Sequence, residues 1–127
     1  MKLLLDTDVL MWALSEPERI KPKVQNLLID ADNIMVLFKC CFFMGITNKK
    51  SLNKISLPTD FISQLQENGF NLLDINYKNI VTIPELPLLH RDLFDRMLIA
   101  KAINDEDVSL ITSNSEITKY DVRIITN

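Results

Sequence analysis

Residues 3–10 read Leu3-Leu4-Leu5-Asp6-Thr7-Asp8-Val9-Leu10, and this stretch decides the fold. Three consecutive leucines predict a buried strand, because the strands of a parallel sheet are covered on both faces. The apolar residues 9–14 predict a helix that packs back on this strand. Asp6 then lies at the carboxyl end of the strand, where open parallel sheets bind their ligands. We therefore expect Asp6 to be a functional carboxylate. The alternative is that Asp8 caps the helix and Asp6 is only a turn residue.

The rest of the chain alternates between short apolar runs and helical patterns. Further strands are expected at 34–38, 70–73, 108–111 and 122–125. Further helices are expected at 24–31, from Pro58 to Asn68-Gly69, at 76–86, 92–103 and 113–119. This alternation predicts an α/β fold in which a mainly parallel central β-sheet is flanked by α-helices. No linker or repeat divides the sequence, so we expect one domain, 1–127.

Composition excludes several classes of protein. With 47% hydrophobic and 24% charged residues, the 127-residue chain is typical of a folded domain, and we expect it in the cytoplasm, without a membrane span. Its two cysteines are adjacent and cannot form an ordinary structural disulfide. A zinc site is not expected, since His90 is the only histidine. The net charge of -3 means that nucleic-acid binding would require a local basic patch or a metal.

Two more polar residues stand where a shared site would need them. Asp95 lies in the first turn of the 92–103 helix among apolar neighbours, and Asn114 follows the 108–111 strand. Oxygen ligands gathered from several strand ends suit Mg²⁺ or Mn²⁺. A purely structural alternative has Asp92 paired with Arg96 while Asp95 caps the helix.

Three segments resemble the PIN domain, and more closely its bacterial VapC-type toxin ribonucleases. They are Leu4-Leu5-Asp6-Thr7 with Trp12-Ala13-Leu14, Leu86-Pro87 with His90-Arg91-Asp92 and Phe94-Asp95-Arg96-Met97-Leu98-Ile99-Ala100, and Leu110-Ile111-Thr112-Ser113 with Tyr120-Asp121-Val122. The second segment is the most specific, and together the three extend over nearly the whole chain.

The resemblance implies a set of site residues. Asp6 and Asp95 match catalytic acidic ligands of Mg²⁺ or Mn²⁺, and Thr112 matches a small hydroxyl residue that lines the site. Asn114 stands where the family usually has an aspartate, so it offers a neutral oxygen to the metal. Gly45 lines the site where a catalytic glutamate is expected, and Met44 precedes it where tryptophan is common.

The resemblance also implies a function: a magnesium-dependent endoribonuclease that is the toxin of a type II toxin-antitoxin system. Its implied partners are an RNA substrate, a cognate antitoxin protein and a second copy in a homodimer. We expect activity to be impaired because Gly45 replaces the glutamate. One alternative is a catalytically inactive PIN-fold protein that binds RNA or the antitoxin.

Another alternative is a phosphatase of the haloacid dehalogenase type, since Asp6-Thr7-Asp8 after an apolar strand resembles that family's nucleophile motif. Leu10 stands where its threonine belongs, and the chain is short for that fold. His90 is not expected to act chemically, because no acidic residue or serine forms a recognisable triad around it in the sequence.

The segment from Lys39 to Asn48 contains two adjacent cysteines and several bulky side chains. Neither the helical nor the strand periodicity explains this run. We interpret it as a frame-shifted stretch of an ordinary family sequence. Read one nucleotide forward, the codons of Met44 and Gly45 must yield tryptophan, and the next codon is glutamate for one of the four glycine codons. Upstream, the cysteine pair becomes alanine or valine. The hidden reading, Ser-Val-Val-Ser-Leu-Trp-Glu or a close variant, resembles the family segment that carries the missing glutamate.

Restoring this hidden segment is expected to recover ribonuclease activity more fully than Gly45→Glu alone, because it returns the side chains around the glutamate as well. The nucleotide sequence provides the first check. If the shifted frame encodes no glutamate at this place, the interpretation is wrong.

Overall fold

The computed structural model describes residues 1–38 and 61–127. In chain order, the elements are β1 (Lys2–Leu5), α1 (Thr7–Ser15), η1 (Pro17–Arg19), α2 (Pro22–Ile29), β2 (Ile34–Phe38), α4 (Phe61–Glu67), β3 (Phe70–Leu73), α5 (Tyr77–Thr82), η2 (Ile83–Glu85), α6 (Leu93–Asn104), β4 (Val108–Thr112), η3 (Ile117–Lys119) and β5 (Ile124–Thr126). Here α denotes an α-helix and η a short 3₁₀ helix. Gly45 and the Lys39 to Asn48 segment lie outside the described residues.

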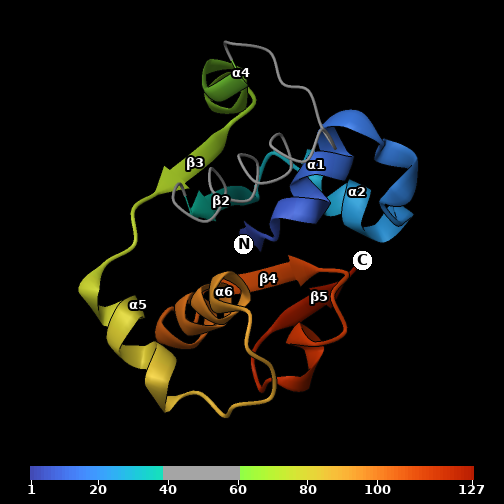
Figure 1. Cartoon of the computed structure of the whole chain (residues 1–127). Helices are drawn as coiled ribbons and strands as arrows, with labels where there is room; N and C mark the ends of the chain where they lie inside the picture. Colours follow the sequence, from blue (N-terminus) through green and yellow to red (C-terminus); the bar gives the residue numbers. More distant parts are fainter. Residues whose placement is uncertain (39–60) are drawn as a thin grey trace.

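The described strands form one five-stranded parallel sheet in the order β3-β2-β1-β4-β5 (Figure 1). The predicted α/β fold with a parallel central sheet is therefore confirmed. The leucine run forms the central strand β1, whose neighbours β2 and β4 cover both of its edges. Within the described ranges, no helix is long and apolar enough to cross a membrane.

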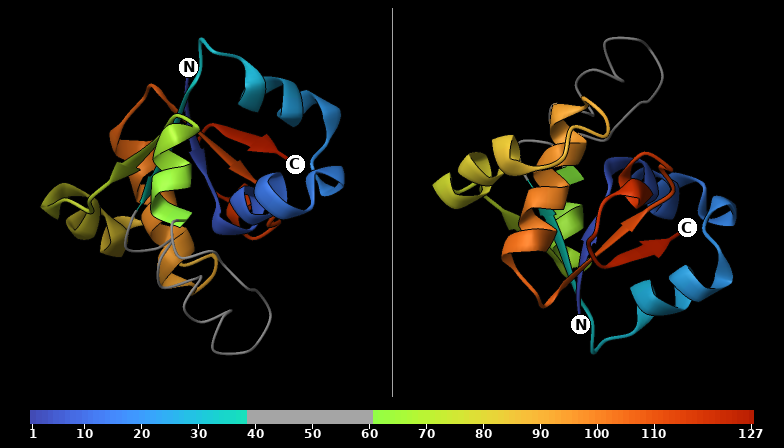
Figure 2. Two further views of the ribbon diagram at one scale, coloured as in Figure 1. Left: turned by 90° about the horizontal axis from the view of Figure 1, so that it is seen from above. Right: turned by 90° about the horizontal axis from the view of Figure 1, so that it is seen from below.

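Two hydrophobic cores lie on the opposite faces of the sheet. Alternate side chains of β1 enter different cores, since Leu3 and Leu5 pack with α1, α2 and α4, whereas Leu4 packs with α6 and η3. Figure 2 shows the blue helices α1 and α2 on one side of the sheet and the orange helix α6 on the other. A strand covered on both faces has no polar side, which explains its unbroken leucine sequence.

Several predicted helix ends differ from the observed ones. The 24–31 helix begins two residues earlier, with Pro22 in its first turn, a position where a proline needs no hydrogen-bond partner. The 76–86 helix becomes the short α5 followed by η2, because Pro84 cannot continue an α-helix. By contrast, Gly69 adopts a φ of 84° just after α4, as expected for a residue that ends a helix.

At the end of the chain, the predicted 113–119 helix is reduced to η3. The side chain of Asn114 accepts a hydrogen bond from the backbone N–H of Glu116 at 2.9 Å, and this local bond competes with helix formation. The last strand runs over 124–126 instead of 122–125.

Leu4→Ala is expected to lower the free energy of unfolding by about 3 kcal/mol, because Leu4 is fully buried in the central strand. The matched control Leu88→Ala removes a side chain that is 69% exposed and should cost under about 0.5 kcal/mol. Urea unfolding of the two variants measures the difference. Equal losses would contradict the assignment of Leu4 to the core.

Candidate active site

The pairing of β1 with β4 places Asp6 beside Thr112. Leu5 and Ile111 are partners in the parallel register, so the next residue of each strand lies at the same edge of the sheet. The backbone N–H of Asp6 donates to the carbonyl of Ile111 at 3.0 Å, and the Thr112 hydroxyl donates to Asp6 Oδ2 at 2.8 Å. Both side chains are buried. Asp6 is the N-cap residue of α1, although its side chain makes no capping hydrogen bond, so Asp8 is not the cap that the alternative required.

Asn114 connects this strand edge to Asp95. Its backbone N–H donates to the Thr112 hydroxyl at 3.0 Å, and its side-chain Nδ2 donates to Asp95 Oδ2 at 3.0 Å. A continuous chain of hydrogen bonds thus runs from Asp6 through Thr112 and Asn114 to Asp95. The structure brings together these four residues that the sequence selected, although they come from three separate segments.

The start of α6 holds Asp95 in place. Asp92, not Asp95, caps the helix, because Asp92 Oδ1 accepts hydrogen bonds from the backbone N–H groups of Phe94 and Asp95 at 2.9 and 3.1 Å. The Asp95 side chain is therefore available to the site. Arg96 does not follow the expected pairing with Asp92 either, since its guanidinium donates to the carbonyls of Pro87 and Ile83.

Sequence reasoning missed the surroundings of His90. Its Nε2 lies 3.1 Å from Asp95 Oδ2, and its Nδ1 lies 3.0 Å from the hydroxyl of Tyr120, which in turn accepts a hydrogen bond from Arg96 at 2.9 Å. The sequence shows no recognisable triad around His90, yet the fold places Asp95 against one ring nitrogen and Tyr120 against the other. Tyr120 is 30 residues away in sequence, so no local spacing could have indicated this contact.

The ionised forms of Asp6 and Asp95 are both disfavoured in the folded chain. Burial raises the pKa of Asp6 above its ordinary value, and the hydrogen bond from Thr112 only partly opposes this. Burial also raises the pKa of Asp95 to about 6, and the negative charges of Asp92 and Asp6 add to the increase, whereas His90 lowers it. For both groups desolvation is the largest cause of the raised pKa, ahead of repulsion from neighbouring carboxylates.

A buried carboxylate and a half-buried one that repel each other suit a hard cation, because a bound cation relieves both the desolvation and the repulsion. Asp6 and Asp95 are the residues that could hold it. The side-chain oxygen of Asn114 accepts one hydrogen bond, from the backbone N–H of Glu116, and its second lone pair could serve a cation. Among the described residues, no three His, Cys, Asp or Glu side chains form a group that could hold a metal, and Gly45 is outside them. The described part of the site therefore offers a cation two carboxylates, which accept hydrogen bonds from the neutral side chains of Thr112 and Asn114.

Asp95→Asn is expected to stabilise the fold at pH 7 by on the order of 1 kcal/mol, after allowance for solvent screening. An aspartate whose pKa is raised to about 6 binds more protons in the folded than in the unfolded chain, so its contribution to stability falls as pH rises from about 4 to 6. Urea unfolding at several pH values measures this slope, with the exposed Asp32→Asn as control. A stability difference that does not vary with pH would contradict the shifted pKa.

Comparison with known proteins supports the fold. No family model matches the sequence, and no curated protein matches it. Among solved structures, the chain is similar to the crystal structure of VapBC2 from Rickettsia felis bound to a DNA fragment from its promoter, with a TM-score of 0.71 and 17% sequence identity. The match covers 99% of this chain and 98% of that chain. At this identity the likeness concerns the fold, and it confirms that the chain has a PIN-like α/β fold.

Proposed function

We propose that this chain is the toxin component of a toxin-antitoxin pair and carries an impaired, metal-dependent endoribonuclease site. The observation that carries the proposal is the approach of Asp6 and Asp95 at one edge of a PIN-like sheet, with Thr112 and Asn114 linking them. Carboxylates that stay ionised at this edge would hold Mg²⁺ or Mn²⁺. A cation of this kind, when bound, activates a water molecule and neutralises charge on a phosphate.

The chain's own side chains would prepare the site for RNA. The Thr112 hydroxyl fixes one oxygen of Asp6, and Asn114 fixes one oxygen of Asp95, so both carboxylates are oriented before a substrate arrives. Because the net charge is negative, attraction to the RNA phosphates depends on the cation and on local lysines or arginines.

Impairment follows from two positions. Gly45, which lies outside the described residues, offers no carboxylate where the resemblance expects a glutamate, and Asn114 is neutral where an aspartate is usual. Loss of such a group commonly reduces the rate on the order of a hundredfold or more. The same two positions favour the second candidate function, an inactive PIN-fold protein that binds RNA or its antitoxin.

The phosphatase alternative has less support. Its threonine position is occupied by Leu10, which is fully buried in α1 and packs in the core. The PIN-like fold also argues against it.

Partners are proposed on the same basis. One solved structure that this chain resembles is VapBC2 bound to a DNA fragment from its promoter. We infer an antitoxin protein and a cytoplasmic homodimer for this chain too. Light scattering of the purified chain, alone and co-expressed with the product of the adjacent gene, tests both partners, and a monomer that binds no such product would contradict them.

Slow RNA cleavage that requires Mg²⁺ or Mn²⁺ is the expected activity, and Asp6→Asn should abolish it because one of the two described carboxylates is lost. The assay compares wild type, Asp6→Asn and the control Asp32→Asn on a structured RNA. Asp32 is exposed and remote in sequence from the site, so its variant should cleave like wild type.

Other outcomes separate the alternatives. No cleavage above the Asp6→Asn background, together with RNA binding, would favour the inactive protein. Hydrolysis of a phosphate monoester that depends on Asp6, without RNA cleavage, would favour the phosphatase.

A further inference from the structure

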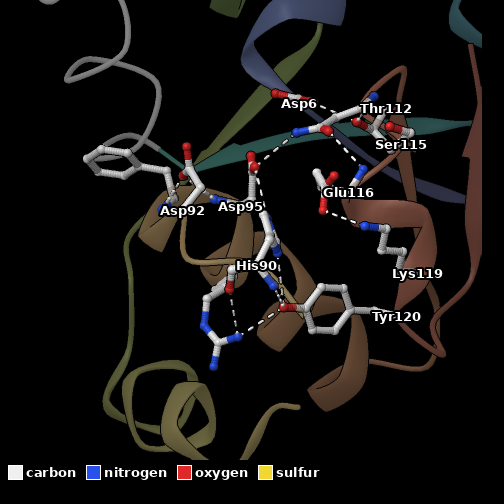
Figure 3. A network of polar contacts seen from close by, with 12 residues as sticks. Asp6, His90, Asp92, Asp95, Thr112, Ser115, Glu116, Lys119 and Tyr120 are labelled. Carbon is white, nitrogen blue, oxygen red and sulfur yellow. Dashed lines mark hydrogen bonds and ion pairs between the residues drawn. The ribbon is translucent and has the colours of Figure 1, made fainter. Parts of the chain in front are cut away.

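A second chain of side chains, which starts at the buried Arg96 and Tyr120, reaches Asp95 through His90. Arg96 and Tyr120 are only 7% and 5% exposed, and Arg96 Nη1 donates to the Tyr120 hydroxyl at 2.9 Å. The hydroxyl contacts His90 Nδ1 at 3.0 Å, and His90 Nε2 reaches Asp95 Oδ2 at 3.1 Å (Figure 3). The candidate ligand Asp95 is thus tied to a buried guanidinium through two intermediate side chains.

The direction of the protons in this chain follows from donor and acceptor chemistry. Arginine can only donate, so the Tyr120 oxygen accepts from Arg96, and it also receives a longer bond from the backbone N–H of His90 at 3.4 Å. The single hydroxyl proton of Tyr120 then remains for His90 Nδ1. A neutral imidazole that accepts at Nδ1 carries its proton on Nε2, and that proton points at Asp95.

Two donors therefore converge on the same oxygen of Asp95. His90 Nε2 and Asn114 Nδ2 both bind Oδ2, at 3.1 and 3.0 Å, and neither bond uses Oδ1. A carboxylate fixed through one oxygen presents the other in a constant direction, which is how residues behind a metal ligand commonly act.

We propose that His90 is a positioning residue: Arg96 and Tyr120 hold its ring in the Nε2–H tautomer, and the ring fixes Asp95 through Oδ2, so that Oδ1 would be left for a cation. The cation rests on the proposed function, whereas the tautomer rests on the hydrogen-bond geometry alone. His90 does not touch the reacting atoms in this scheme, so it differs from a general base.

Nitrogen NMR can test the tautomer directly, because His90 is the only histidine and gives a single imidazole signal. With ¹⁵N-labelled histidine at about pH 8, where an ordinary imidazole is neutral, we expect one fixed Nε2–H form with a slowly exchanging proton. Tyr120→Phe should make that proton exchange faster, because the ring loses its partner at Nδ1. Tyr77→Phe is the matched control, since Tyr77 is 79% exposed. A proton fixed on Nδ1, a doubly protonated ring, or no difference between the two tyrosine variants would overturn the proposal.

Binding of Mn²⁺, followed by electron paramagnetic resonance, tests the positioning role without any activity assay. His90→Leu removes the donor and should weaken Mn²⁺ binding about tenfold or more. His90→Gln keeps an N–H group that can reach Asp95, so it should recover most of the affinity. Equal loss in both variants, with wild-type melting temperatures, would overturn the role of the donor.

The two proposals fail in distinguishable ways. If wild type binds no Mn²⁺, or if Asp6→Asn leaves Mn²⁺ binding unchanged, the proposed function and the role of His90 toward a cation are overturned. The NMR experiment still decides the tautomer in that case. If Asp6→Asn abolishes binding but His90→Leu does not weaken it, the site stands and the positioning role fails.

Discussion

The parallel pairing of β1 with β4 determines where the polar groups of the site lie. The register that joins Leu5 to Ile111 puts Asp6 and Thr112 next to each other at the carboxyl edge. A shift of one residue in either strand would turn one of these side chains to the other face of the sheet. The leucines of β1 prevent such a shift, because they fill different cores on the two faces. The hydrophobic pattern of one strand thus fixes the position of a carboxylate that is itself unfavourable to bury.

The cost of the two carboxylates shows that the site is not optimised for the stability of the chain. Burial raises the pKa of both Asp6 and Asp95, so the ionised forms are disfavoured in the folded chain. The surrounding donors, Thr112, Asn114 and His90, reduce this cost without removing it. Locally unfavourable groups that the fold nevertheless holds in place are typical of functional sites. A structural role alone, such as capping, would not require Asp95 to be buried, since Asp92 already caps α6.

The helices and strands that the sequence predicted well are those with the clearest pattern of apolar residues. All five described strands and the long helix α6 were expected, because their apolar runs are continuous or clearly periodic. Helix ends were less predictable where a proline or a local side-chain hydrogen bond competes with the hydrogen bonds of the helix, as at Pro84 and Asn114. Asp6 and Asp95 could be selected as neighbours from topology, since parallel strands share an edge. The contact between His90 and Tyr120 could not, because it depends on how α6 and η3 pack together.

The buried network around Arg96 explains how the described part of the site is held in place. Arg96 ties the carbonyls of Ile83 and Pro87 to Tyr120, so it joins the segment before α6 to η3. Arg96 is the donor in all three of these bonds, so removing its side chain would break them together, at a cost of roughly 1.5–3 kcal/mol for each bond that a charged group makes. The fold therefore preserves this network whether or not RNA is cleaved. The same bonds that orient His90 toward Asp95 also hold two segments of the chain together.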